Sequence, residues 1–95
     1  MRKVTAKIRA AFIRGHSLSV GNTSTNGESV FLHGNEILYK SKDGAKVYGS
    51  LAGWNTPTTR ERLNGITQDR WTQKDYEPYF NGDPIGENQW KETSL

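Results

Sequence analysis

Residues 28–51, ESVFLHGNEILYKSKDGAKVYGSL, decide the fold that we expect for this chain. The stretch contains three runs rich in β-branched, aromatic and aliphatic residues: Glu28–His33, Glu36–Ser41 and Ala45–Leu51. They are separated by Gly34-Asn35 and by Asp43-Gly44, and glycine-containing pairs of this kind between such runs are typical of tight hairpin turns. The stretch therefore predicts an antiparallel meander of three strands.

On its N-terminal side we expect a helix over residues 4–14. Four apolar residues recur at helical spacing and form one stripe: Val4, Ile8, Ala11 and Phe12. Gly15 is placed to end this helix in the left-handed conformation. The polar segment that follows predicts a short strand, at Ser17–Val20 or at Thr23–Thr25.

A second helix is expected over residues 57–64, on the C-terminal side of the meander. Thr56 is a suitable N-cap, because its hydroxyl can accept a hydrogen bond from a free N–H of the first turn. Pro57 suits the first helical position, since its missing N–H would have no helical partner there. Gly65 is placed to close the helix in the left-handed conformation.

The remaining segments predict a further hairpin and a tail. Ile66–Lys74 and Glu77–Phe80 are expected to pair as strands, and Asn81-Gly82 is expected to turn the chain again. Residues 87–95 are polar and acidic, and we expect a loosely held, flexible tail there, after a single domain over residues 1–86. The predicted fold class is α+β: an N-terminal helix, an antiparallel meander, a short second helix and a further hairpin.

The expected core is small, because only 33% of the residues are hydrophobic. A second helix of about two turns is too short to be stable alone, so we expect it to dock on the sheet through Leu63 and Trp54. The predicted core combines the stripe of the first helix with apolar and aromatic residues of the strands: Ile8, Phe12, Phe31, Ile37, Tyr39, Val47, Leu51, Trp54 and Leu63.

The composition excludes several classes of function. The 95 residues include no cysteine, which excludes disulfides, thiol catalysis and cysteine-ligated metal sites. No apolar run approaches the roughly 18 residues of a membrane-spanning helix, and no apolar region follows the basic start as it would in a signal peptide. We therefore expect a cytoplasmic protein with no membrane partner.

The sequence gives little indication of catalysis or metal binding. His16 and His33 are the only histidines and show no metal-binding spacing. His33 sits at a hairpin edge, where we expect it to hydrogen-bond to the turn. There is no nucleophile elbow, phosphate-binding loop or dinucleotide-binding motif. We expect a non-enzymatic protein with no cofactor, no metal site and no catalytic residue.

Charge is distributed unevenly along the chain, whose net charge is +3. Residues 1–14 carry five cations and no acid, whereas residues 75–95 carry five acids and one lysine. A basic segment suits a phosphate backbone. The alternative is that the basic and acidic ends partly neutralise one another on the surface of the protein.

Weak nucleic-acid binding is one function that this pattern predicts. Basic residues share a sector of the first helix, and hydroxyl and guanidinium groups cluster at the start of the second. The expected contacts are Lys3, Lys7, Arg14, Thr58, Arg60 and Arg62. Four aromatic residues would add base stacking if they were exposed: Tyr39, Tyr48, Trp54 and Trp71. No motif that reads a base sequence is present, so we expect little sequence specificity.

Several short strings provide a second line of inference. They are Leu32-His33-Gly34-Asn35, Gly53-Trp54-Asn55-Thr56, Thr58-Thr59-Arg60 and Arg62-Leu63-Asn64-Gly65, with a looser match at Tyr79-Phe80-Asn81-Gly82. In these strings the chain resembles a group of small, mostly uncharacterised proteins of tailed bacteriophages and prophages. The resemblance implies a viral origin and action in the host bacterial cytoplasm.

Contact with a host protein is the other function that these observations leave open. Small phage proteins of this kind often act by covering a functional surface of a host protein, for example a component of host defence. The sequence therefore predicts a weak nucleic-acid-binding protein, with a host protein that it modulates or inhibits as the alternative partner.

Overall fold

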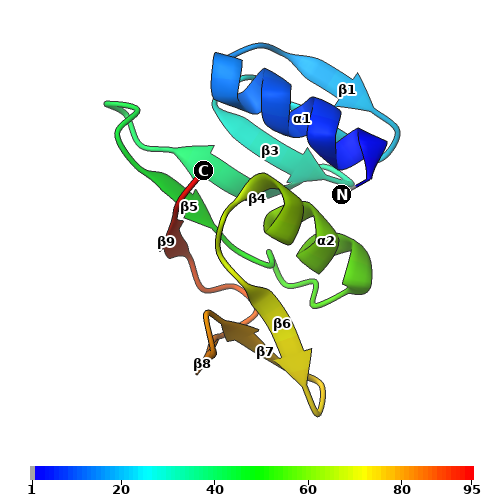
Figure 1. Cartoon of the computed structure of the whole chain (residues 1–95), viewed down its shortest axis with the longest axis vertical. Coiled ribbons are helices and arrows are strands. Elements are labelled where there is room, and N and C mark those ends of the chain that lie inside the picture. The colour runs from blue at the N-terminus through cyan, green and yellow to red at the C-terminus, as the bar shows by residue number, and fades with distance from the viewer. Residues whose placement is uncertain (1) are drawn as a thin grey trace.

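The computed structural model describes residues 2–95 and has an α+β fold with two antiparallel sheets (Figure 1). This fold class agrees with the prediction from sequence. The elements, in chain order, are α1 (Lys3–Arg14), β1 (Leu18–Val20), β2 (Thr23–Thr25), β3 (Ser29–Leu32), β4 (Asn35–Lys40), β5 (Val47–Gly49), α2 (Pro57–Ile66), β6 (Trp71–Lys74), β7 (Glu77–Phe80), β8 (Asp83–Pro84) and β9 (Lys91–Thr93).

The larger sheet has the strand order β1-β2-β3-β4-β5-β9, with every neighbouring pair antiparallel. The predicted meander is confirmed as β3, β4 and β5, and both short segments considered before it form strands, β1 and β2. The two helices lie side by side against one face of this sheet (Figure 1). The register of β3 against β4 shifts between Val30 and Phe31, and the extra residue in β4 lets both Ile37 and Leu38 be buried.

Two-residue turns connect several of the strand pairs. The turn between β3 and β4 consists of His33 and Gly34, one residue earlier than the predicted Gly34-Asn35. Both residues have positive φ, 50° and 80°, which is the backbone conformation whose twist suits a tight hairpin. Asn35 is thereby free to begin β4. The predicted turn at Asn81-Gly82 is confirmed between β7 and β8.

The two helices end in different ways. Gly15 closes α1 with a φ of 74°, as predicted. The prediction that Gly65 closes α2 is wrong, because the helix continues to Ile66. Ile66 is fully buried, and its carbonyl accepts a hydrogen bond from Nε of Arg9 at 3.1 Å, so contacts with α1 favour the longer helix. The strand predicted to start at Ile66 consequently begins only at Trp71.

Trp71 joins the smaller sheet, β6-β7-β8, to the rest of the molecule. Its side chain is 1% exposed and meets the Phe80 ring edge to face, with the ring centroids 4.7 Å apart. A Cβ atom at Gly49 of β5 would lie only 2.9 Å from the indole, so the glycine makes room for it. The side chain of Asn64 in α2 donates to the carbonyl of Trp71 and accepts from its N–H, both at 2.7 Å.

Most of the predicted core is buried: Ile8, Phe12, Ile37, Val47, Leu51 and Leu63. Phe31 and Tyr39 are only half-buried, because the alternation along their strands turns them to the face of the sheet without helices. The prediction for Trp54 is wrong, since its side chain is 57% exposed. Other core residues were not predicted from the sequence: Val30, Leu32, Leu38, Ile66, Trp71, Phe80 and Ile85.

The segment expected to be a flexible acidic tail contributes an edge strand to the larger sheet. In β9, Glu92 is paired with Tyr48 of β5, and its carboxylate lies 3.6 Å from the ammonium group of Lys46. Earlier in the segment, the carbonyl of Glu87 accepts a hydrogen bond from the N–H of Gly53 at 2.8 Å. Within residues 2–95, neither helix has the length and apolar character needed to span a bilayer.

Candidate functional site

A cavity of about 360 Å³ opens between the β3–β4 hairpin and the start of α2. Its apolar lining comes from Leu32, Ile37 and Leu51, which are almost fully buried. Trp54 forms a further part of the lining, and polar groups complete it: His33, Asn35, Thr56, Thr58 and Thr59. An apolar hollow with a few polar groups around it is the usual form of a binding site.

Trp54 reaches this cavity because the chain turns sharply after β5. Ala52 and Gly53 both have positive φ, 54° and 83°, and the N–H of Trp54 donates to the carbonyl of Leu51 at 2.9 Å. This turn carries the indole away from the core toward solvent. Exposed tryptophan is among the residue types that contribute most to protein interfaces, so the position is a candidate contact.

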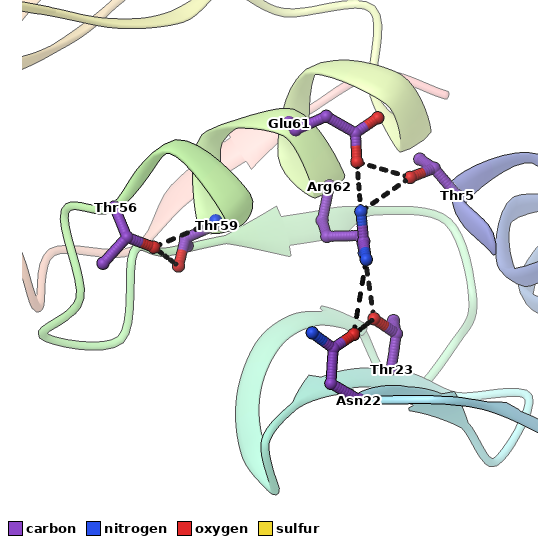
Figure 2. A network of polar contacts seen from close by, with 7 residues as sticks. All are labelled: Thr5, Asn22, Thr23, Thr56, Thr59, Glu61 and Arg62. Atoms are coloured by element: carbon purple, nitrogen blue, oxygen red, sulfur yellow. Dashed lines mark hydrogen bonds and ion pairs between the residues drawn. The ribbon is translucent and has the colours of Figure 1, made fainter. Parts of the chain in front are cut away.

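The start of α2 is fixed by hydroxyl groups (Figure 2). Oγ1 of Thr56 accepts a hydrogen bond from the N–H of Thr59 at 3.2 Å and lies 2.9 Å from Oγ1 of Thr59. The predicted N-cap and the predicted place of Pro57 are both confirmed. Thr58, which the sequence predicts as a nucleic-acid contact, is half-buried and lines the cavity.

Arg60 ties the loop around Trp54 to the smaller sheet. Its Nη1 donates to Oδ1 of Asn55 and, at 3.2 Å, to Oε1 of Gln73. Nδ2 of Asn55 also donates to the carbonyl of Tyr76 at 3.4 Å. Tyr76, at the turn between β6 and β7, is 89% exposed. Asn55, next to Trp54, thus links Arg60 and the main chain of Tyr76, and we call Trp54, Arg60 and Tyr76 the aromatic rim.

Arg62, another predicted nucleic-acid contact, is 4% exposed and lies at the centre of a polar network (Figure 2). Its Nε donates to Oγ1 of Thr23 at 2.9 Å, and its Nη2 donates to Oδ1 of Asn22 at 3.3 Å. Its Nη1 donates to Oγ1 of Thr5 at 3.2 Å and forms an ion pair with Glu61. The guanidinium therefore holds α2 to α1 and to the start of β2, and it is not available to a phosphate on the surface.

Glu61 supplies the negative charge that a buried guanidinium requires. Partial burial alone would raise the pKa of Glu61. Hydrogen bonds from Thr5 (2.6 Å) and Arg62, together with the charge of Arg62, outweigh burial and hold that pKa below its ordinary value. The carboxylate is therefore ionised at neutral pH, and the charge of Arg62 is compensated inside the fold.

The remaining predicted contacts, Lys3, Lys7 and Arg14, are exposed on α1. On a helical wheel they share a sector of about 40°. Thr5 and Arg9, which bond to α2, lie about half a turn away from that sector. The structure consequently does not bring the six predicted residues together. Three lie on the side of α1 away from α2, two lie at the start of α2, and Arg62 is buried between the helices.

His33 is exposed at the cavity, and its backbone N–H donates to the carbonyl of Asn22 at 2.8 Å. His33 thus makes this hydrogen bond through its main chain, and the residue forms part of the cavity lining. In the part of the chain that the structure describes, no group of three or more His, Asp or Glu side chains is arranged to hold a metal ion.

Sequence reasoning did not predict the cavity. Its lining comes largely from Leu32-His33-Gly34-Asn35 and from the string that starts at Gly53, two strings that also carry the resemblance to phage proteins. The two strings are thus the feature of the sequence from which the site could have been found. Nothing local in either of them indicates that they face one another, because the hairpin and the helix meet only in the folded chain.

The comparisons with known proteins place the chain in one family. A family model described as "Kyanoviridae Gp96 protein" matches residues 1–94. The search of curated proteins and the search of solved structures gave no match. The family match confirms the phage origin that the resemblance implies.

Proposed function

We propose that this chain, which belongs to the Kyanoviridae Gp96 family of phage proteins, is a non-enzymatic binding protein that modulates a host protein in the bacterial cytoplasm. In this proposal an apolar side chain of the host protein enters the cavity, and the aromatic rim contacts the surface around it. The observation that carries the proposal is the exposed indole of Trp54 beside the apolar lining formed by Leu32, Ile37 and Leu51.

The size and chemistry of the cavity fit one large side chain of a partner. A volume of about 360 Å³ is at the small end of the range for ligand pockets, so it suits a side chain better than a large cofactor. Burial of such a side chain would contribute about 1.5–3 kcal/mol to binding. The hydroxyl of Thr58 and the amide of Asn35 can then orient the partner by hydrogen bonds.

Charge near the aromatic rim favours a protein partner over a nucleic acid at this surface. Asp75 and Glu77 flank Tyr76 in the chain, and both are exposed. Carboxylates repel a phosphate backbone. They do not disturb contact with a protein surface that is neutral or basic.

Affinity capture from host lysate tests this proposal with two variants that alter the cavity in opposite ways. Trp54→Ala removes the exposed indole, whereas Thr58→Arg places a long charged side chain at the opening. We expect the wild-type protein to retain a stoichiometric host protein and both variants to retain at least about tenfold less, which corresponds to about 1.4 kcal/mol.

The matched control is Trp90→Ala, because Trp90 is also exposed but packs against Tyr39 on the face of the sheet without helices. It should retain as much host protein as the wild type. Equal retention by the wild type and both cavity variants, or no retained protein at all, would refute the proposal.

Nucleic-acid binding is the second candidate function. It is favoured by the exposure of Lys3, Lys7 and Arg14 on one side of α1 and by the absence of ion pairs to them within residues 2–95. A gel-shift series on single- and double-stranded DNA and RNA at low salt tests it. Replacing any one phosphate-contacting cation should weaken binding to all sequences alike. It should also reduce the slope of the logarithm of the binding constant against the logarithm of the salt concentration by about one unit. No shift at tens of micromolar protein would end this candidate.

A further inference from the structure

The larger sheet ends in two edge strands of different character. At one edge, β9 carries Lys91 and Glu92, and charged residues on an edge strand discourage the addition of another strand. At the other edge, β1 has the sequence Leu18-Ser19-Val20, which contains neither a charge nor a proline. The β1 edge is short, but it carries no charge and no proline that would discourage pairing with a further chain.

The backbone of β1 has groups available for such pairing. β1 is antiparallel to β2, with Val20 opposite Thr23 at the tight turn and Ser19 opposite Ser24. In a two-residue hairpin the pair next to the turn exchanges both hydrogen bonds, and the next residue turns its N–H and C=O outward. Ser19 consequently presents a donor and an acceptor to whatever lies beyond the edge.

A row of cations borders this same edge. The sector of α1 that holds Lys3, Lys7 and Arg14 faces away from α2, and Figure 1 shows β1 and α2 on opposite sides of α1. From Lys3 to Arg14 the helix rises about 16 Å, which matches a strand of about five residues. We call these three residues the basic row.

Apolar surface lies at the start of the open edge. Leu18, the first residue of β1, is 37% exposed. Ile13 of α1 is also exposed, at 45%, but on the helical wheel it lies about 100° from the centre of the basic row, toward the side of Thr5 and Arg9. Leu18 is therefore the apolar side chain that a strand added at this edge would meet.

We infer that the β1 edge accepts an extended acidic segment of a partner polypeptide as an added strand. The main chain of the segment would pair with Ser19, and its alternate side chains on the helix side would place carboxylates against the basic row. An apolar residue near one end would cover Leu18. This surface is separate from the cavity, so the inference extends the proposed function to a second contact.

A polypeptide fits these features better than a nucleic acid does. A phosphate backbone would use the basic row, but it has no need of the outward N–H and C=O of Ser19 or of the exposed Leu18. A strand uses all three features at once, since main-chain hydrogen bonds supply affinity and alternate side chains supply specificity.

The test measures binding of a labelled short peptide of alternating Glu and Val to the full-length protein by fluorescence anisotropy at low salt. The decisive protein variant is Ser19→Pro, which removes the outward N–H without touching the ladder to β2. A variant with Lys3, Lys7 and Arg14 all replaced by Gln tests whether the positive charge of the basic row contributes to peptide binding. We expect each variant to weaken peptide binding by about tenfold or more.

A second peptide with the same sequence but with alternate backbone nitrogens methylated keeps its charges and cannot form the ladder, so it should bind at least about tenfold more weakly. Thermal melts of both protein variants should match that of the wild type, because the altered groups face outward. Equal binding of the two peptides, or of Ser19→Pro and wild type, would overturn the inference, as would no peptide binding. Tighter binding of single-stranded oligothymidine that displaces the peptide would assign the basic row to nucleic acid instead.

Discussion

Two tryptophans and two arginines in and around α2 lie in opposite surroundings. At the start, Trp54 and Arg60 lie in a loop and a first turn that face solvent. Arg62, in the second half of the helix, and Trp71, at the start of β6 after it, are almost completely buried. Each pair consists of one tryptophan and one arginine, yet one pair forms a surface and the other pair holds the fold together.

The difference lies in the partners that each side chain meets. Arg60 bonds to Gln73 in an exposed contact and to Asn55 in a partly buried one. Arg62 bonds to residues of α1 and of the β1–β2 hairpin, which lie far away in the sequence. Residue type alone therefore does not predict whether an aromatic or basic side chain contributes to stability or to binding.

The largest effect on stability is expected for Trp71→Ala. It would leave a cavity between the two sheets and remove the hydrogen bond from Nε1 of the indole to Oγ1 of Thr67, which measures 3.1 Å. We expect a loss of about 3–5 kcal/mol in the free energy of unfolding, measured by urea titration. A loss below about 1 kcal/mol would mean that Trp71 does not join the sheets as described.

Arg62→Ala should have the next largest effect, lowering the free energy of unfolding by about 3 kcal/mol. It leaves the Glu61 carboxylate and the Thr5 and Thr23 hydroxyls without the guanidinium that donates to all three. Arg60→Ala is the matched control. Its contact with Gln73 is exposed and its contact with Asn55 is only partly buried, so Arg60→Ala should lower the free energy of unfolding by less than about 1 kcal/mol. Equal losses for the two variants would remove the contrast between the two ends of α2.

Acid should weaken the buried end of α2 by protonating Glu61. The pKa of Glu61 is lower in the folded state than in the unfolded state. The ionised carboxylate therefore contributes fully to the free energy of unfolding above the unfolded-state pKa, about 4.3, and this contribution is lost as the pH falls through the folded-state pKa. We expect the stability advantage of wild type over Glu61→Gln to shrink over that acidic range, in urea titrations at several pH values. A constant difference between the two proteins would contradict this role.

Thr56→Ala should destabilise by about 1 kcal/mol, because it removes the acceptor for the N–H of Thr59 at the start of α2. Thr58→Ala provides the comparison at a neighbouring threonine that makes no cap, and it should leave the melting temperature nearly unchanged. If both variants lose the same stability, the cap contributes nothing specific.

The smallest effect on stability is expected for Trp54→Ala, less than about 0.5 kcal/mol, because more than half of the indole is already in water. The same variant should lose binding to the host protein. A large fall in the melting temperature would place Trp54 in the fold and not at its binding surface.

The local signals in the sequence predicted the elements well. The apolar stripe of α1, Gly15 at its end, Thr56-Pro57 at the start of α2 and the turn at Asn81-Gly82 all occur as expected. Each depends on backbone preferences within a few residues, so a short window of sequence contains the information. The end of α2 was missed because a contact with Arg9, remote in sequence, favours the two extra residues.

The sequence by itself thus determined the α+β class, the meander, the end of α1 and the start of α2, since hydrophobic periodicity and turn residues act locally. Only the tertiary structure decided which tryptophan is buried, which arginine is paired and where the cavity opens. Burial depends on the neighbours that a side chain meets, and the partners of Arg62 and the two sides of the cavity come from segments that approach one another only in the folded chain.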